Sequence, residues 1–322
     1  MSEKQFIYAV ARIRFKEMQL LDTQFINQLL SSKSYRECLQ LLLDKGWGEE
    51  GQTDPDQILA YEKQKTWDFL EDLIEDMSVF DILFITNDYH NLKAAIKLVY
   101  TGEEPEGYFL PHGTISSKVI MEAVKKQEFE LLPNSMAATA KEAYEILTRT
   151  GDGQLCDLIV DRAAMEALQA RGKKETHEVL KTYAELTVAT ANIKIAVRAQ
   201  STGKSPEWIR RALIPCDTID VEKLFEAATS GMEEIIQYLS DTIYADGVDE
   251  LKISLARFER WCNDLLIQKI KPQKYNPYTI GPLVAYILAR RNEIQVVRII
   301  LLGKLNQLPD ESIRERIREL YV

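Results

Sequence analysis

The segment from Thr202 to Ser205, Thr-Gly-Lys-Ser, ends like a phosphate-binding loop. In such a loop, backbone N–H groups and a lysine hold the phosphates of a nucleotide. The pattern also needs a glycine five residues before Gly203, and Arg198 stands there. The preceding residues carry a helical pattern, whereas a phosphate-binding loop follows a strand. The sequence therefore predicts that this segment binds no nucleotide.

Other residues that could do chemistry are scattered. No pair of cysteines is spaced as CxxC, and no histidine has a carboxylate at metal-ligand spacing. We expect reduced, mostly buried thiols and structural or surface imidazoles; these residues are Cys38, Cys156, Cys216, Cys262, His90, His112 and His177. Two carboxylate pairs have helical i, i+4 spacing, Glu71 with Glu75 and Asp72 with Asp76, but on so acidic a segment exposure is expected. The sequence thus predicts no catalytic residue, no cofactor site and no metal site.

The most informative signal is an internal repeat. The pattern Asn, five residues, a base, four residues, Gly occurs three times, at offsets of 101 and 100 residues. Its members are Asn91, Lys97 and Gly102, then Asn192, Arg198 and Gly203, then Asn292, Arg298 and Gly303. Apolar residues after each asparagine follow helical spacing, and each glycine falls where a helix C-terminus favours a left-handed residue. Glu293 departs from the pattern, because Leu92 and Ile193 stand there in the other copies.

The rest of the chain also reads as helical. Helix-forming patterns cover 17–45, 57–78, 137–149, 155–170, 174–202, 221–241, 249–270 and 280–302. The expected loops are 46–55, 102–113, 150–153, 213–220, 245–247 and 271–277. Because glycine and proline are scarce, long helices with few breaks are favoured over a turn-rich β-fold. The prediction is an all-α protein of three pseudo-symmetric helical units, 1–115, 116–215 and 216–322.

Charge is distributed unevenly around a net value of −10, which disfavours a general nucleic-acid binder. Residues 48–86 hold 11 acidic and 2 basic residues, whereas 252–304 hold 10 basic and 3 acidic ones. These are either solvated helix faces or the two ends of a molecule that docks between partners. The longest uncharged stretch, 275–289, is shorter than the roughly 20 apolar residues of a membrane-spanning helix and contains two prolines. We also expect no signal peptide, because the first residues lack its apolar run.

The three repeated bases are the candidate partner-binding residues. Lys97, Arg198 and Arg298 project away from the apolar stripe of their predicted helices. They are either exposed bases that suit the helix C-termini or groups that three like units aim at a shared centre. Near the third copy, Tyr275 and Tyr278 could mark a contact surface, whereas core packing is expected for Tyr286.

The triplicated motif, the opening segment from Tyr8 to Arg14 with Leu20 and Leu21, and the closing segment from Asn292 to Lys304 resemble the C subunit of bacterial and archaeal V/A-type rotary ATPases. That protein is the counterpart of the d subunit of eukaryotic vacuolar ATPases, and the resemblance covers essentially the whole chain. It implies a funnel-shaped, all-helical, non-catalytic protein at the cytoplasmic face of the membrane, without a membrane span. Its implied partners are the central-stalk shaft subunits and the proteolipid rotor ring, and its implied role is in ATP-linked proton or sodium transport.

Two other interpretations stay open. A generic cytosolic helical-repeat scaffold would also need no active site. An enzyme with a cryptic site between subdomains would instead gather carboxylates and histidines in a deep pocket.

Overall fold

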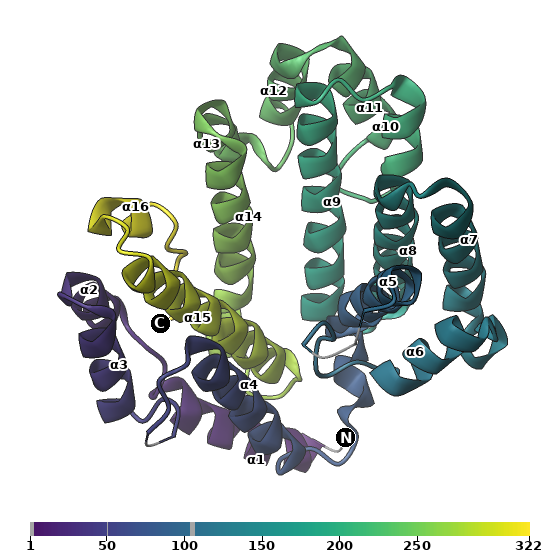
Figure 1. Ribbon diagram of the computed structural model, residues 1–322. Helices are drawn as coiled ribbons and strands as arrows, with labels where there is room; N and C mark the ends of the chain where they lie inside the picture. The colour runs from purple at the N-terminus through teal and green to yellow at the C-terminus, as the bar shows by residue number, and fades with distance from the viewer. Residues whose placement is uncertain (1–2, 50, 104–106) are drawn as a thin grey trace. The chain divides into compact units, whose positions relative to one another are not determined.

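The computed structural model describes residues 3–49, 51–103 and 107–322, and it is all-helical, as predicted (Figure 1). Within those residues the only regular elements are α-helices and short 3-10 helices. The α-helices are α1 (Glu3–Glu17), α2 (Thr23–Ser31), α3 (Tyr35–Asp44), α4 (Pro55–Glu71), α5 (Ile85–Thr101), α6 (Ser117–Lys126), α7 (Asn134–Thr150), α8 (Gly153–Lys174), α9 (Glu178–Ser201), α10 (Pro206–Ala212), α11 (Val221–Ser230), α12 (Met232–Ser240), α13 (Val248–Ile253), α14 (Leu255–Ile270), α15 (Gly281–Leu305) and α16 (Asp310–Arg314). The 3-10 helices are η1 (Met77–Leu83), η2 (Phe129–Leu131), η3 (Ala245–Gly247) and η4 (Lys271–Tyr275).

The chain divides into two compact units. Unit 1 contains both ends of the chain, residues 1–77 and 244–322 with the short piece 177–179. Unit 2 contains residues 78–176 and 180–243. The division into three repeat units at 115 and 215, and their arrangement as a funnel, stay predictions.

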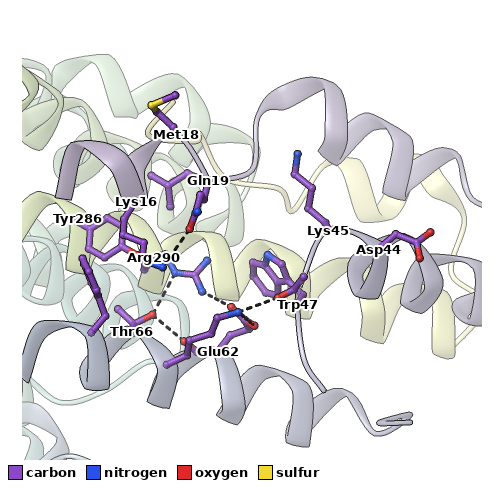
Figure 2. Close-up of a pocket in the computed structure, with 14 residues that line it drawn as sticks. Lys16, Met18, Gln19, Asp44, Lys45, Trp47, Glu62, Thr66, Tyr286 and Arg290 are labelled. Atoms are coloured by element: carbon purple, nitrogen blue, oxygen red, sulfur yellow. Dashed lines mark hydrogen bonds and ion pairs between the residues drawn. The ribbon is translucent and has the colours of Figure 1, made fainter. Parts of the chain in front are cut away.

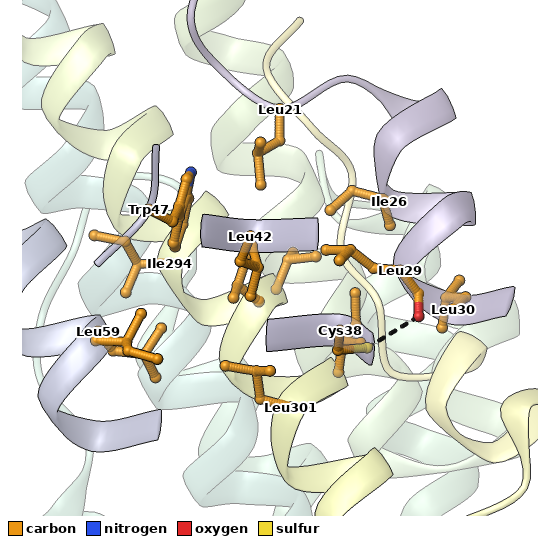
Figure 3. Packing of buried hydrophobic residues seen from close by; sticks show 14 of the residues in the cluster. Leu21, Ile26, Leu29, Leu30, Cys38, Leu42, Trp47, Leu59, Ile294 and Leu301 are labelled. Atoms are coloured by element: carbon orange, nitrogen blue, oxygen red, sulfur yellow. Dashed lines mark hydrogen bonds between the residues drawn. The ribbon is translucent and has the colours of Figure 1, made fainter. Parts of the chain in front are cut away.

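The core of unit 1 is built around α15. This helix packs against α1, α3, α4, α14 and α16. Its sequence is apolar on nearly all sides, which is typical of a helix surrounded by protein. Leu29, Leu42, Ile300 and Leu301 belong to its buried cluster, which joins the first and last parts of the chain (Figure 3). Unit 1 therefore depends on contacts between residues more than 200 positions apart in the sequence.

A buried cluster of unit 2 lies between α5, α6, α7 and α8; α5 packs against the other three helices, and α7 packs against α8. Leu92, Ala95 and Ile96 of the first repeat helix are fully buried there, as their helical spacing predicts. Ala140 and Ala143 of α7 are buried in the same cluster, and their small side chains allow close packing against the neighbouring helices α5 and α8. The apolar stripe of the first repeat is thus a core face.

Capping residues divide some helices that the apolar pattern presents as continuous. The predicted helix 17–45 is interrupted twice, and Asp22 and Ser34 each accept a hydrogen bond from the first turn of the helix that follows. The predicted helix 249–270 is likewise divided at Ser254, which caps α14. Gly231 separates α11 from α12 inside the predicted helix 221–241. No sequence pattern indicated α6.

The glycines of the repeat do not all have the same role. Gly102 and Gly203 are left-handed, with φ of 73° and 62°, as predicted for the end of a helix. The prediction is wrong for Gly303, because α15 continues to Leu305 and the left-handed residue is Gln307. A Cβ atom on Gly303 would lie 2.6 Å from the side chain of Ile313. This third glycine is needed for close packing rather than for a turn.

A few further expectations concern loops and the C-terminal helix. Pro309 followed by Asp310 and Glu311 is typical of a helix start, so the sequence predicts a terminal helix there with an Asp310–Arg314 pair. Helix α16 does begin after Pro309, but Asp310 pairs with Lys304 at 2.6 Å. Arg314 instead donates to Asn27. Residue 50 of the predicted loop 46–55 and residues 104–106 of the predicted loop 102–113 lie outside the described residues. Among the described helices, none combines the length and the apolar character needed to cross a bilayer.

Candidate functional site

The asparagine that opens each repeat is buried and holds the backbone of a later segment. Asn91 donates to the carbonyl of Leu110 at 3.0 Å and accepts from its N–H at 2.8 Å. Asn192 does the same to Ile214, at 2.7 and 3.0 Å. An amide side chain offers one donor and one acceptor side by side, as a backbone peptide does, so it can pair with an extended segment.

The third copy keeps this contact in part. Asn292 donates to the carbonyl of Glu319 at 2.7 Å, and its side chain is also buried. The N–H of Glu319 is bound by another residue, since Asp264 accepts it at 2.7 Å. The three asparagines therefore share one role, which is to fix a segment that returns to the repeat helix 19, 22 and 27 residues later.

A carboxylate supports the first two contacts. Asp88 accepts from the N–H and the hydroxyl of Thr114, which lies four residues after Leu110. Glu185 accepts the corresponding two bonds from Thr218, four residues after Ile214. Burial raises the pKa of Asp88, although its bonds to Thr114 and Ile115 oppose that shift. Sequence analysis missed these carboxylates, because Asp88 precedes its asparagine by one helical turn and Glu185 by two.

The three predicted partner-binding bases lie on the repeat helices and none of them is buried. Lys97 on α5 pairs with Asp157 on α8, with 2.6 Å between Nζ and Oδ1. Arg298 on α15 pairs with Asp56 at 3.1 Å. Arg198 on α9 is exposed. Lys97 and Arg198 belong to unit 2 and Arg298 to unit 1, so a centre shared by all three stays a prediction.

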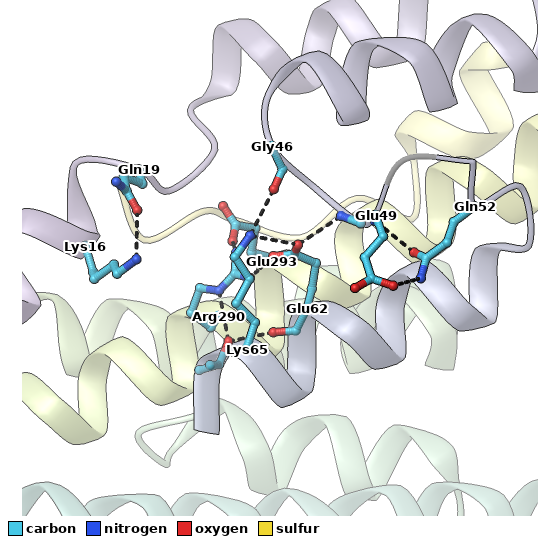
Figure 4. A network of polar contacts seen from close by, with 11 residues as sticks. Lys16, Gln19, Gly46, Glu49, Gln52, Glu62, Lys65, Arg290 and Glu293 are labelled. Carbon is cyan, nitrogen blue, oxygen red and sulfur yellow. Dashed lines mark hydrogen bonds and ion pairs between the residues drawn. The ribbon is translucent and has the colours of Figure 1, made fainter. Parts of the chain in front are cut away.

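Glu293, the residue that departs from the repeat pattern, belongs to a buried cluster of charges. It accepts from the guanidinium of Arg290, one turn earlier on α15 (Figure 4). It also accepts from the N–H of Leu21. Arg290 also donates to Glu62 of α4 at 2.6 Å and to the hydroxyl of Thr66 at 3.3 Å. The third copy thus places a carboxylate where the first two place an aliphatic side chain.

This cluster holds α15, α4 and the segment after α1 in one arrangement. Arg290 and Glu293 are 7% and 3% exposed, so their charges are removed from water and must satisfy one another. Burial lowers the pKa of Arg290, but the carboxylates of Glu293 and Glu62 outweigh burial and raise it. Burial raises the pKa of Glu293 against the opposing effect of Arg290. The guanidinium therefore stays charged, and it is the group that binds both carboxylates and the hydroxyl of Thr66.

A pocket of about 490 Å³ opens beside this cluster in unit 1 (Figure 2). Arg290 forms part of its wall, with its guanidinium carbon 5.0 Å from the centre of the Trp47 ring. Phe69 and Tyr286 form an aromatic wall, edge to face at 6.1 Å. Tyr286 is buried, as expected, whereas Tyr275 and Tyr278 are 87% and 60% exposed.

Three lysines, Lys16, Lys45 and Lys65, line the same pocket. Lys65 donates to the carbonyl of Gly46 at 2.9 Å and to Glu62 at 3.3 Å. The ammonium of Lys16 lies 5.1 Å from the centre of the Phe69 ring and donates to the amide oxygen of Gln19 at 3.3 Å. Burial, followed by the nearby charges of Lys65 and Arg290, lowers the pKa of Lys16. The pocket therefore combines cationic groups with aromatic surface.

The residues that sequence analysis considered for catalysis do not converge. Three of the cysteines are buried thiols, and burial raises the pKa of Cys156 to about 11, which disfavours the reactive thiolate. Glu71, Asp72, Glu75 and Asp76 are exposed as expected, but α4 ends at Glu71, so they do not share a helix. Across the described ranges, no three His, Cys, Asp or Glu side chains are placed to hold a metal ion.

The segment tested as a phosphate-binding loop is a connection between helices. Gly203 is the left-handed residue just after α9, and Ser205 caps α10 by accepting from the N–H of Trp208. The preceding residues are helical, as the sequence indicates.

Comparison with known proteins gives one family. Residues 9–316 match the family model described as ATP synthase (C/AC39) subunit.

Individual relatives agree with this match. The C subunit of the V-type sodium ATPase of Enterococcus hirae is 24% identical over 96% of this chain and 97% of its own length. The C subunit of the V-type ATP synthase of Thermus thermophilus is 24% identical over 97% of this chain and 98% of its own length. The C subunit of the A-type ATP synthase of Methanocaldococcus jannaschii is 23% identical over 98% of this chain and 86% of its own length. Each similarity extends over nearly all of the chain.

Proposed function

The chain belongs to the ATP synthase (C/AC39) subunit family, and from this premise we propose that it is a non-catalytic subunit of a V/A-type rotary ATPase. In this role it couples the rotating central shaft to the proteolipid rotor ring for ATP-linked proton or sodium transport. The observation that carries the proposal is the family match over residues 9–316. The relatives are named as subunits of a sodium ATPase and of ATP synthases. These names agree with ATP-driven ion pumping as well as with ATP synthesis.

The build of the chain supports a mechanical rather than a chemical role. A protein that passes torque between partners has to resist deformation, and densely packed helices do so because protein cores are little compressible. The buried asparagine contacts add fixed points, since each ties the segment after a repeat helix back to that helix. Breaking such a bond inside a core leaves an unpaired polar group, which costs about 1–3 kcal/mol.

The proposed location is the cytoplasmic face of the membrane, where the protein is held through its partners. Lys97, Arg198 and Arg298 are the proposed contact residues for the shaft. All three are accessible at least in part, so an acidic partner surface can reach them. The ion pairs of Lys97 and Arg298 lie at the surface, where the exchange of one carboxylate for another costs little.

The test is capture of the tagged, full-length chain from detergent-solubilised membranes, followed by identification of the co-purified peptides. We expect the shaft subunits and the rotor-ring proteolipid of one ATPase. Recovery of other proteins, with the ATPase intact but left behind, would instead support a generic helical scaffold. Calorimetry with ATP provides a second measurement, and we expect neither saturable binding nor hydrolysis by the purified chain.

A further inference from the structure

The pocket beside Arg290 carries an excess of positive charge that the protein itself does not neutralise. Its lining includes four basic side chains, Lys16, Lys45, Lys65 and Arg290, against two acidic ones, Asp44 and Glu62. Glu62 is already engaged by Arg290, Lys65 and the N–H of Gly48. Asp44 is exposed and is held by Gln40 of its own helix. Lys65 and Arg290 are paired with Glu62, and Arg290 is paired with Glu293 as well. The ammonium of Lys45 lies 5.3 Å from the centre of the Phe25 ring, which is not part of the lining. The charge that lacks a counter-charge inside the pocket is therefore that of Lys16.

Lys16 shows this imbalance most clearly. Among the described residues it forms no ion pair, and its one hydrogen-bond acceptor is the neutral amide of Gln19. Partial burial removes some of the water around its ammonium, and the charges of Lys65, Arg290 and Arg12 lower its pKa further, opposed by the attraction of Glu62. Binding of an anion beside such an ammonium is favourable, because its attraction offsets the repulsion from the neighbouring cations.

We propose that this pocket is a docking site for a carboxylate of a protein partner, presented next to an apolar side chain, with Lys16 and Lys65 as its cationic ligands. The inference rests on the proposed function, because it takes the partner to be a neighbouring subunit. It goes beyond that function by assigning a site in unit 1 that is separate from the three repeated bases.

Four features favour a polypeptide over a small anion such as phosphate. The lining includes three aromatic side chains, Trp47, Phe69 and Tyr286, which an apolar group of a peptide can contact. Met18 stands at the pocket with 83% of its surface exposed and offers a flexible apolar contact. The buried carboxylate of Glu62 disfavours a dianion more strongly than a monoanion. A volume of about 490 Å³ lies within the range of ligand pockets and exceeds the need of a single small ion.

The test uses the isolated full chain labelled with ¹³C on its methionine methyl groups. Met18 is the one methionine among the residues that line the pocket, and its resonance is assigned with Met18→Leu. The probes are acetyl-Leu-Glu-Leu-amide, its neutral counterpart acetyl-Leu-Gln-Leu-amide, and inorganic phosphate. We expect the acidic peptide to shift the Met18 resonance in a saturable way, and the neutral peptide to bind at least about tenfold more weakly.

Variants identify the ligands. Lys16→Gln should weaken binding of the acidic peptide by about tenfold or more, because the substitution removes one charged hydrogen bond. Lys63→Gln is the matched control, since Lys63 lies on α4 close to Lys65 but does not line the pocket, and binding should be unchanged. Lys16 is used rather than Lys65, because Lys65 also bonds to Gly46 and its loss could loosen the loop.

Several results would overturn the proposal. They are the absence of a Met18 shift with the acidic peptide, equal binding of the two peptides, or full binding by Lys16→Gln. A shift with phosphate that matches the peptide shift would make the pocket a small-anion site instead. These outcomes are independent of the membrane capture experiment, so the pocket can fail while the proposed function stands, and the reverse.

Discussion

At the scale of single residues, the repeat is defined by its asparagines. Asn192 is fully buried and forms two bonds with the backbone of Ile214. Aspartate has the same shape but lacks the donor, so Asn192→Asp places a carboxylate against the carbonyl of Ile214. We expect a loss of more than about 1–3 kcal/mol in unfolding free energy at neutral pH, because the unpaired group is also charged.

This loss should depend on pH in a defined direction. Burial raises the pKa of the new carboxyl above its unfolded value, so the folded variant binds more protons than the unfolded one between the two values. The variant should therefore recover stability as the pH falls through the raised pKa, where its O–H can donate to Ile214. Asn306→Asp is the control, since Asn306 makes a similar bond to Leu302 at the surface. Urea unfolding at several pH values measures both, and equal losses would contradict a special role for the buried amide.

Arg290 and Glu293 give a second prediction at this scale. Replacing Glu293 with leucine, the residue of the first copy, removes one partner of Arg290 and leaves the N–H of Leu21 without its acceptor. We expect the loss of one member of this buried pair to cost about 3–5 kcal/mol. The double variant Arg290→Met/Glu293→Leu replaces the pair by apolar groups and should be destabilised less than the sum of the two single variants. Strict additivity in thermal and urea unfolding would contradict direct coupling.

Sequence analysis found part of this cluster and could not have found the rest. The substitution of a carboxylate for an aliphatic residue at Glu293 was visible from the repeat. Its partner Glu62 stands 228 residues before Arg290, and no local pattern connects two side chains at such a distance. Likewise, Lys16 and Lys65 read as ordinary helix-surface lysines, and only the packing of α1 and α4 around α15 places them in one pocket.

At the scale of elements, the repeat shows one motif used for two purposes. Gly203 ends its helix in a left-handed conformation, with open space where a Cβ would be, so Gly203→Ala should cost about 1–2 kcal/mol through backbone strain alone. Gly303 is helical and touches Ile313, so Gly303→Ala should destabilise through overlap. Ile313→Ala alone removes a buried core side chain and should cost about 2–5 kcal/mol. It should cost less when Gly303→Ala is already present, because the overlap is then relieved, and its full amount when Gly203→Ala is present. Unfolding of the three single and two double variants measures this, and equal behaviour of the two glycines would refute it.

Helix ends explain most differences between the expected and observed elements. Apolar spacing identified the helices that form the cores, including α5, α8 and α15. It did not show where they stop, because a serine or aspartate that caps one helix can stand inside an uninterrupted apolar pattern, as Ser34 and Ser254 do. The prediction that Gly303 ends a helix failed because a glycine can also be required by close packing. Its contact with Ile313 is a tertiary contact, which no local sequence pattern shows.

At the scale of the whole molecule, the repeated bases carry the main functional prediction. Changing Lys97, Arg198 and Arg298 together to glutamate should weaken binding to the purified central shaft, with an effect that shrinks at high salt, where the Debye length is about 3 Å. The new side chains at 97 and 298 would face Asp157 and Asp56, so a stability loss of about 0.2–1 kcal/mol at each position is expected. Helical content should not change.

The matched control for this variant carries the same change in net charge. Lys118, Lys125 and Lys174 are exposed lysines of unit 2 outside the repeat positions, and their reversal to glutamate should leave shaft binding intact. If both triple variants bind the shaft equally well, the repeated bases are not its contact residues. Interferometry with the immobilised shaft would distinguish the two outcomes.

The division of the chain between its two units has a consequence for biosynthesis. Nearly all of unit 2 is continuous in sequence, so its helices can pack as soon as they leave the ribosome, whereas the first 77 residues need α15 to complete their core. At about 5–20 residues per second, translation of the intervening residues leaves the leucines of α2 and α3 uncovered for roughly 10 to 40 s. During that interval the nascent N-terminal segment is a target for chaperones and for aggregation, and a ribosome that stalls before α15 would release a chain with one finished unit and one that cannot close.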